Sequence, residues 1–477
     1  MRTYIGFFLV VLFCSTSVKA QDVYIDIPAS NIFNRTEFIT NQNVLNTGTH
    51  TSWRTPFIGL AVLDPTIKST SGNNFTHTTL PVFLSTNILH WRLASIGGHI
   101  PPFRLGDVWP VYKWFITSEQ TWYQPITTLG YRTPGNVVFT FKVPSEKFTV
   151  NSYHAGNYSL GVTHNYGTSS YYAIEFTPDN LQVILRIPSA ISWLSNTPTK
   201  YIEINDLNAF RSTGTYMLGN LGNAELGNTV NFNFWAKASS SLIQFTSSKG
   251  VQGSRDISTI KLGSTSPKLT TLPLSGNSQT YSTSNFIVEN GNRNNFTLDL
   301  SVSADDFKTH FFEAGTYTFQ LNLDAISTDN TVSSSQNTDV TINVLPLSEI
   351  NISSGHEVNF NFNTAMDYQQ GKSKVMPNHI KLSNNENFEL YVKAGTNFFK
   401  KAGVQSDINS NILEVGVDGI SALPLSITPQ KIISAGAPVL DGELDIKYNI
   451  SPTAAQSLVG KEKTTYAIDV IYSFTAL

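Results

Sequence analysis

The stretch FEAGTYTFQLNLDA (residues 312–325) decides the fold, because a close copy, YHAGNYSLGVTHN, occurs at residues 153–165. Both stretches contain Ala-Gly-x-Tyr followed by alternating apolar and polar residues, and a degenerate third copy, TTYAIDVIY, occupies residues 464–472. Such alternation is typical of a strand with one face in a core. The glycine supplies backbone freedom at the preceding turn, so the tyrosine opens the strand. We interpret the motif as a marker of the fold and not as a catalytic site.

Two other phrases recur in the same order before this motif. Trp91, Trp235 and Tyr391 occupy the same position in phrases that begin with Asn, such as NFNFWAKAS, and LTTLPLS (269–275) and ISALPLS (420–426) come next. Collinear markers at a spacing of about 150 residues indicate an internal repeat. We predict that Trp91, Trp235 and Tyr391 are equivalent buried aromatic residues.

Within each repeat the sequence favours short strands joined by Gly, Asn, Ser and Pro turns, and the best candidates for short helical turns are near residues 145–148, 304–307 and 452–458. Frequent turns and alternating strands predict an all-β protein of three tandem immunoglobulin-like antiparallel β-sandwich units. Polar stretches that contain Pro or Ser place the limits of these units. We predict a first unit with an aromatic insertion at residues 21–197, a second unit at residues 198–346 and a third unit at residues 347–477.

Residues 1–20, MRTYIGFFLVVLFCSTSVKA, have the pattern of a signal peptide: a basic residue, an apolar stretch, and small residues before the expected cleavage site. The single cysteine, Cys14, lies in this segment, so the mature chain is expected to have no thiol and no disulfide. No other apolar run approaches the ~20 residues that span a bilayer. We expect an exported chain, in the periplasm, at the cell surface or outside the cell, without a transmembrane anchor.

Composition and motifs argue against nucleic-acid binding and catalysis. Charged residues make up 14% of the 477 residues and the net charge is -3, without a basic run. Asp305, Asp306 and His310 are close in sequence and could act as acid and base or hold a metal, but two Asp at a turn more often cap a short helix. No phosphate loop, nucleophile elbow or paired-His spacing occurs. We predict no enzymatic activity, no catalytic residue, no metal and no cofactor.

An aromatic segment in the first unit, HIPPFRLGDVWPVYKWFITSEQTWYQP (residues 99–125), has no counterpart in the other two units. Exposed aromatic faces suit sugar rings and protein interfaces, with Arg104, Asp107 or Lys113 as polar neighbours. The alternative is that these side chains complete a larger core, because aromatic residues are usually buried. The candidate ligand-binding residues are Trp109, Tyr112, Trp114, Trp122 and Tyr123.

An exported β-sandwich with an early Asn-x-x-x-Trp strand and a late Ala-Gly-x-Tyr strand resembles the pilin-like subunits of bacterial surface fibres, particularly the spore coat U type of chaperone-usher systems. The chain departs from that pattern in having three units, no cysteine pair, and no Ala-Gly before Tyr466. The resemblance implies a structural or adhesive role at the cell surface. It also implies other fibre subunits or an assembly chaperone as partners.

Two hypotheses for the function therefore stand at this stage. In the first, the chain is a non-catalytic fibre subunit or adhesin, and an alternating strand at residues 23–27 or 466–474 serves as a donor strand or as the edge that meets a chaperone. In the second, it is a carbohydrate-binding protein that recognises a glycan or another host-surface ligand through the aromatic segment.

Overall fold

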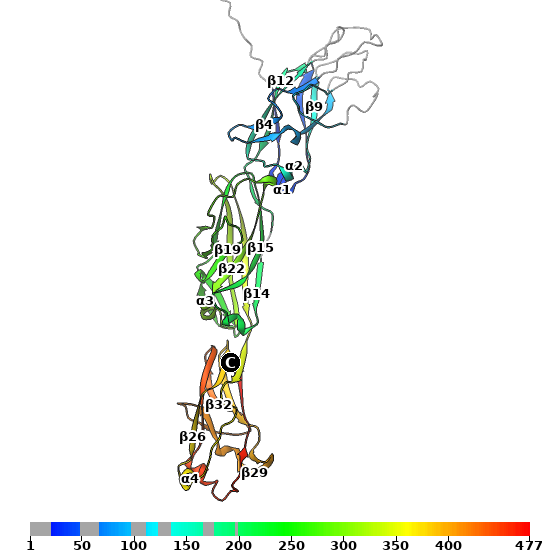
Figure 1. Cartoon of the computed structure of the whole chain (residues 1–477). Coiled ribbons are helices and arrows are strands. Elements are labelled where there is room, and N and C mark those ends of the chain that lie inside the picture. Colours follow the sequence, from blue (N-terminus) through cyan, green and yellow to red (C-terminus); the bar gives the residue numbers. More distant parts are fainter. Residues whose placement is uncertain (1–20, 48–65, 97–110, 123–134, 166–175, 196–198) are drawn as a thin grey trace, which may run out of the picture.

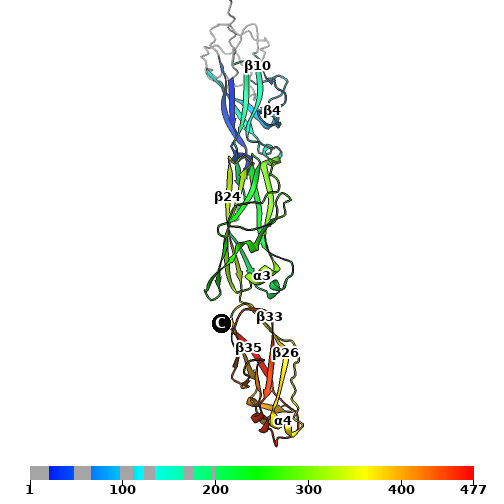
Figure 2. The same ribbon diagram turned by 90° about the vertical axis from the view of Figure 1, so that its left-hand side faces the viewer.

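The computed structural model describes residues 21–47, 66–96, 111–122, 135–165, 176–195 and 199–477. Strands dominate these residues, so the predicted all-β fold with antiparallel sheets is confirmed. The sheets form three groups that follow one another along an elongated molecule (Figures 1 and 2). We call them the first (residues 21–187), second (191–344) and third (348–476) β regions. The predicted signal peptide lies outside the described residues.

The first β region has two sheets that enclose a core containing Trp91, Phe139, Phe141 and Tyr158. One sheet has the order β1-β12-β10-β3-β8, with β4 on β10 and β5 on β4, and the other has the order β11-β2-β9-β6-β7. Its elements are β1 Gln21–Asp26, α1 Ala29–Asn34, β2 Phe38–Thr47, β3 Thr66–Ser69, β4 Asn74–His77, β5 Phe83–Ser85, η1 Thr86–Ile88, β6 His90–Ile96, β7 Lys113–Trp114, β8 Gln120–Thr121, β9 Gly135–Val143, α2 Lys147–Val150, β10 Gly156–Asn165, β11 Phe176–Thr177 and β12 Asn180–Ile187.

The second β region repeats this plan. Its sheets have the orders β14-β24-β23-β16-β21, with β17 on β23 and β18 on β17, and β13-β15-β22-β19-β20. Its elements are β13 Ile191–Trp193, β14 Thr199–Ile204, η2 Leu207–Arg211, β15 Thr215–Asn228, β16 Phe232–Ala238, β17 Leu242–Ser247, β18 Gln252–Asp256, η3 Ile257–Thr259, β19 Ile260–Ser264, β20 Leu272–Pro273, β21 Gln279–Thr280, η4 Asn290–Asn292, β22 Arg293–Ser303, α3 Ala304–His310, β23 Gly315–Ser327 and β24 Ser333–Val344.

The third β region has one five-stranded sheet, β25-β26-β33-β30-β31, and two three-stranded sheets, β32-β27-β35 and β29-β28-β34. Its buried core is the smallest of the three. Its elements are β25 Ser348–Ile352, α4 Ala365–Gln370, β26 Lys372–Asn384, β27 Phe388–Ala394, β28 Phe398–Lys401, β29 Val404–Asn409, η5 Ser410–Ile412, β30 Glu414–Val417, β31 Leu423–Pro424, β32 Gln430–Gly436, β33 Val439–Ile450, α5 Pro452–Gln456, β34 Tyr466–Ala467 and β35 Val470–Ala476.

The order of the elements shows which parts of the three regions correspond. In each region a long strand (β9, β22 or β33) leads into a short helix (α2, α3 or α5), and the strand with the tyrosine marker follows. The three short helices that the sequence predicted are therefore confirmed. The unit limits remain a prediction, and β13 lies before the predicted limit at residue 197 although it pairs with β15 of the second region.

The aromatic markers are only partly equivalent. Trp235 on β16 and Tyr391 on β27 occupy corresponding strands, since these strands pair with β23 and β35 respectively. Trp91 lies on β6, which pairs with β9 and corresponds to β19, so its predicted equivalence is wrong. Trp91 is buried, whereas Trp235 and Tyr391 are half-buried because their neighbours in the strand face the core. A short phrase of Asn followed by an aromatic residue can occur on any strand that has one face in solvent. The phrase therefore did not distinguish β6 from the strands that correspond to β16.

The Ala-Gly-x-Tyr motif serves the fold as predicted. Gly156 and Gly315 have positive φ values of 131° and 151°, and a Cβ on Gly156 would lie 2.5 Å from His77 Nε2. The buried tyrosines close the turn with their hydroxyls: Tyr317 donates to the Glu313 carbonyl oxygen at 2.8 Å, and Tyr158 accepts from the His154 N–H at 3.0 Å.

Burial of Tyr158 makes the stability of the first region sensitive to alkaline pH. Burial raises the pKa of Tyr158 to about 12, whereas an unfolded tyrosine titrates near 10. The unfolded chain therefore loses this proton first, so the contribution of the neutral phenol is complete below about pH 10 and is lost as the pH rises towards about 12. We expect the urea midpoint to fall across this window and Tyr158→Phe to reduce the fall. An identical pH profile in the variant would contradict this.

The first and second regions meet through direct hydrogen bonds. The buried side chain of Asn292 accepts from the Tyr153 N–H at 2.9 Å and donates to the Tyr153 and Asn228 carbonyl oxygens at 2.8 Å each. The Arg293 guanidinium donates to the Phe33 carbonyl oxygen at the end of α1, at 3.0 Å from Nε. These bonds fix the joint, which is therefore not a free linker.

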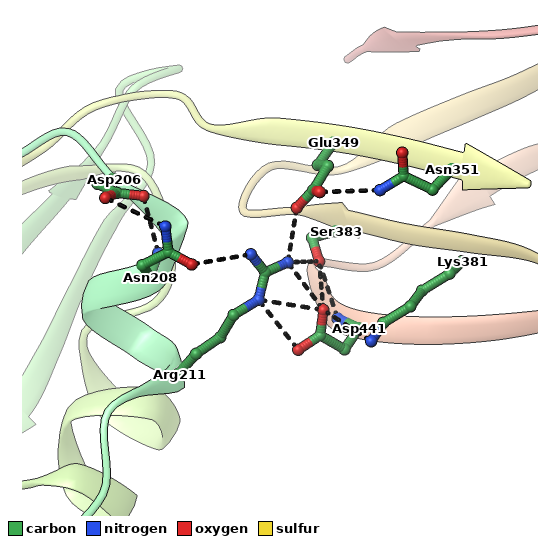
Figure 3. Close-up of polar contacts among 8 residues, drawn as sticks. All are labelled: Asp206, Asn208, Arg211, Glu349, Asn351, Lys381, Ser383 and Asp441. Atoms are coloured by element: carbon green, nitrogen blue, oxygen red, sulfur yellow. Dashed lines mark hydrogen bonds and ion pairs between the residues drawn. The ribbon is translucent and has the colours of Figure 1, made fainter. Parts of the chain in front are cut away.

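Arg211 ties the second region to the third (Figure 3). From the end of η2, its Nη2 contacts Glu349 of β25 at 2.6 Å and Asp441 of β33 at 2.8 Å. The guanidinium lowers the pKa of both carboxyl groups. Beside it, the Asn385 side chain accepts from the Leu347 N–H at 2.7 Å, so this joint is also held by paired polar groups.

Candidate functional site

The third β region has an open sheet edge at β35. In the first and second regions, the strand that carries the tyrosine marker pairs with a later strand, β12 or β24. That later strand runs parallel to β1 or β14 and so joins the two. Among the described residues, β35 pairs only with β27, and no strand corresponds to β12 or β24. In the third region, the position next to β35 is therefore not filled by any strand of the described residues.

Side chains beside this open edge are less buried than their counterparts. Leu321, Leu323 and Ala325 on β23 are buried, whereas the inward-facing residues of β35 are only half-buried. The segment at residues 356–363 corresponds to β14 but forms no strand, and its apolar side chains are likewise only half-buried. Two rows of apolar side chains thus flank the missing strand: Val470, Tyr472 and Phe474 on β35, and Val358, Phe360 and Phe362 on the segment.

The backbone of β35 also presents unpaired groups to this edge. The Leu477 N–H donates to the Asn387 carbonyl oxygen, and the Asp469 carbonyl oxygen accepts from the Gly395 N–H. The backbone N–H and C=O groups that point towards β27 are therefore those of residues 469, 471, 473, 475 and 477. Backbone groups alternate in direction along an antiparallel strand. The N–H and C=O groups of Val470, Tyr472 and Phe474 therefore point to the open edge.

A chain of hydrogen bonds lies under the open edge. His379 Nδ1 donates to the Ser354 carbonyl oxygen at 2.5 Å, so its Nε2 accepts from the Tyr448 hydroxyl at 2.9 Å. The Tyr448 and Tyr472 hydroxyls are 2.7 Å apart. Burial raises the pKa of both phenols above the usual value. These hydrogen bonds hold Tyr472 in place, so the row of apolar side chains on β35 is fixed in position. We call the space between the two apolar rows the groove.

The predicted aromatic site is divided by the structure. Trp109 and Tyr123 lie outside the described residues, as do Arg104 and Asp107. Trp122 is 5% exposed and packs edge-to-face against Phe139 and Phe176, so it belongs to the core.

Trp114 on β7 and Tyr112 just before it lie towards the outside of the sheet that contains β6 and β9. Trp114 is 45% exposed, and its ring is 5.8 Å from that of His90. Tyr112 is half-buried under the guanidinium of Arg92 and the ammonium of Lys142. Lys113, between them, donates to the Thr121 carbonyl oxygen at 2.5 Å and is engaged in the fold. Trp122 therefore follows the core alternative, whereas ligand binding by Trp114 and Tyr112 stays a prediction.

The acidic cluster on α3 has the arrangement of a helix start. The Ser303 hydroxyl accepts from the Asp306 N–H at 3.1 Å and donates to the Asp306 carboxylate at 2.6 Å. His310 lies one turn further on, 3.9 Å from Asp306. No group of three or more His, Cys, Asp or Glu side chains that could hold a metal occurs among the described residues.

The two strands proposed as donor or edge have different outcomes. β1, which contains most of residues 23–27, is paired along its length with β12, and Val23 and Ile25 are buried. It is therefore not available as a donor strand. Residues 466–474 form β34 and most of β35, which is the open edge described above. The segment at residues 356–363 was not predicted, although residues 358–362, VNFNF, alternate apolar and polar side chains.

Comparisons with known proteins give structural similarity alone. No protein-family model matches the chain, and no curated protein matches its sequence. CfaE, the adhesive subunit of CFA/I fimbria of enterotoxigenic Escherichia coli, is 10% identical with a TM-score of 0.26, covering 69% of this chain and 98% of its own. CsuE, in the chaperone–tip adhesion subunit complex from Csu pili of Acinetobacter baumannii, is 12% identical with a TM-score of 0.28, covering 60% and 99%.

A third solved structure, the CooA pilin subunit from enterotoxigenic Escherichia coli, is 13% identical with a TM-score of 0.23 and covers 33% of this chain and all of its own. Adhesin and pilin subunits of bacterial pili are thus among the solved structures similar to this chain. No helix among the described residues is long and apolar enough to cross a membrane.

Proposed function

We propose that the chain is an exported, non-catalytic subunit of a bacterial surface fibre, in which it acts in assembly and adhesion. One observation carries the proposal: no strand among the described residues pairs with β35 in the way that β12 pairs with β10 and β24 with β23. An unpaired strand between two apolar rows is a poor surface for an isolated protein, because it binds any strand that can pair with it. We infer that a strand from another subunit, or from an assembly chaperone, fills this position.

The chemistry of the edge supports strand addition as the mode of binding. The free N–H and C=O groups of β35 provide main-chain hydrogen bonds, and the two apolar rows provide pockets for alternate side chains of the incoming strand. The incoming strand would therefore be an alternating sequence with apolar residues at every second position.

The pairing of β1 supports a place at the end of the fibre. A subunit inside a fibre receives one strand and gives another, but β1 is held in its own sheet by six residue pairs with β12. We propose that the chain receives a strand at its third region and presents its first region outward. The second region, with its two fixed joints, would then separate the outward surface from the point of attachment.

Phe474→Asp tests this proposal. A carboxylate in the groove would have to be buried by the incoming strand, which is strongly unfavourable, so we expect the variant to be folded but absent from fibres on the cells that produce it. Ile471→Asp is the matched control, since Ile471 is on the same strand and 42% exposed. Immunolabelling of intact cells measures the result. Surface labelling of Phe474→Asp at the level of the control would contradict strand addition at β35.

Carbohydrate binding is a second candidate function, and it could belong to the same adhesive subunit. It is favoured by Trp114 of the first region, whose side chain is 45% exposed. An exposed indole offers an apolar plane on which a sugar ring can stack, while nearby polar groups orient the hydroxyls.

A further inference from the structure

An outer row of side chains surrounds Trp114. Pairing of β2, β9, β6 and β7 places Ile39 opposite Lys142, Lys142 opposite His90, and His90 opposite Trp114. Residues directly opposite in antiparallel strands share one face of the sheet. Ile39 is 53% exposed and Trp114 is exposed as well, so this face is turned to solvent.

A second row lies beside the first. Arg92 is two residues beyond His90 on β6, about 7 Å along the strand and on the same face. Its guanidinium carbon is 4.9 Å from the centre of the Tyr112 ring. The ammonium of Lys142 is 5.4 Å from the same centre. The face therefore combines an exposed indole with two cations held on a tyrosine.

Arg92 differs from the other arginine that stacks on a tyrosine in this region. Arg186 lies 4.7 Å from the Tyr24 ring, and its Nη2 donates to the Asp26 carboxylate at 2.6 Å. Arg92 has the same kind of stack but forms no ion pair or hydrogen bond through its side chain with any described residue, and its Nε is buried without a partner. Because the protein covers Nε, a ligand would reach this guanidinium through its Nη groups, which can donate to a carboxylate.

The charges around the face are mainly positive. Lys142 is paired with Glu37, whereas Arg92 has no carboxylate partner among the described residues. The pKa of His90 is lowered, first by burial and then by the positive charges of Lys147 and Lys142, with Glu146 opposing them. His90 is therefore neutral at pH 7 and adds a flat polar ring beside Trp114.

We propose that this face binds a sugar that carries a carboxylate, with the sugar ring on Trp114 and the carboxylate on Arg92. The inference rests on the proposed carbohydrate-binding function and specifies its ligand class. A planar guanidinium matches the two oxygens of a carboxylate, and its stacking on Tyr112 holds it ready for that contact. The two rows are about 7 Å apart along the strand on one face of the sheet, so one oligosaccharide can contact both groups.

The experiment compares an oligosaccharide that ends in a hexuronic acid with its methyl ester, which has the same ring and no charge. Binding of both to the purified chain is measured by calorimetry. We expect the acid to bind about tenfold or more tightly than the ester. Arg92→Gln should remove this difference, and Trp114→Ala should weaken both. Arg186→Gln is the control, because its guanidinium already has a carboxylate partner.

Each outcome has a distinct meaning. Equal binding of acid and ester that is lost in Trp114→Ala but unchanged in Arg92→Gln would overturn the carboxylate and keep carbohydrate binding. No binding of either sugar by the folded chain would overturn both the inference and the carbohydrate function. Thermal melting of each variant shows whether it is folded, and Arg92→Lys, which retains the charge but not the planar fork, should recover only part of the preference.

Discussion

The thermal midpoint of the third β region is expected to rise by roughly 10 °C or more when a copy of residues 328–344, which form the turn and strand β24, is added after Leu477. The carboxyl end lies beside the joint with the second region (Figure 1), so an added strand can turn back along β35 as β24 does along β23. It would cover the half-buried rows of Tyr472, Phe474, Phe360 and Phe362. Burial of each large apolar side chain contributes about 1.5–3 kcal/mol before the loss of chain entropy.

The control for this experiment is the same extension with Ser at the positions that copy Val340, Ile342 and Val344, which are buried in the second region. This strand can form the same backbone hydrogen bonds but cannot fill the groove. We expect it to give less than half of the increase. Calorimetry of the whole chain resolves the effect if the first and second regions keep their midpoints. No increase with the apolar strand would mean that the third region is already closed.

Trp122→Ala is expected to lower the free energy of unfolding of the first β region by ~3–5 kcal/mol, because it leaves a cavity between the two sheets. The indole is 4.9 Å from the Phe176 ring and 5.4 Å from the Phe139 ring, centre to centre, so both aromatic neighbours lose their packing. Denaturant unfolding followed by fluorescence of the remaining tryptophans measures the change. Trp122→Phe should recover part of the loss.

Trp114→Ala is the matched control for this loss. Trp114 belongs to the same aromatic segment but lies on β7 and is 45% exposed, so its removal should change the free energy of unfolding by less than about 1 kcal/mol. An equal loss at the two positions would mean that Trp114 is part of the core, and the proposed sugar platform would then be withdrawn.

The sequence predicted the parts of the fold that depend on local patterns. Alternating residues identified the strands, and the motif at Tyr158 and Tyr317 was found on corresponding strands because a buried tyrosine after a positive-φ glycine has strict geometric needs. Trp91 was misplaced because an Asn-aromatic phrase says which face of a strand is apolar but not which neighbours the strand has. Pairing between distant strands is set by the whole sheet, and one phrase cannot reveal it.

The candidate sites show the same limit. The aromatic segment was recognised as unusual, but only the paired strands separate Trp122 in the core from Trp114 outside. Arg92 could not be found from sequence, since its significance is the absence of a carboxylate near it among the described residues, whereas Arg186 has one. The open edge was expected in general terms, and the segment at residues 356–363 was recognisable only after β14 and β24 had shown what normally lies there.

The parallel pairing of β14 with β24 has a mechanical consequence. The chain enters the second region at the start of β14 and leaves it at the end of β24, and six residue pairs join these strands, from Thr199–Asp339 to Ile204–Val344. A force along the molecule would pull the start of β14 towards the first region and the end of β24 towards the third region. Since the strands run in the same direction, the load would act in shear on all of their hydrogen bonds together, which is the loading geometry in which a sheet resists force best.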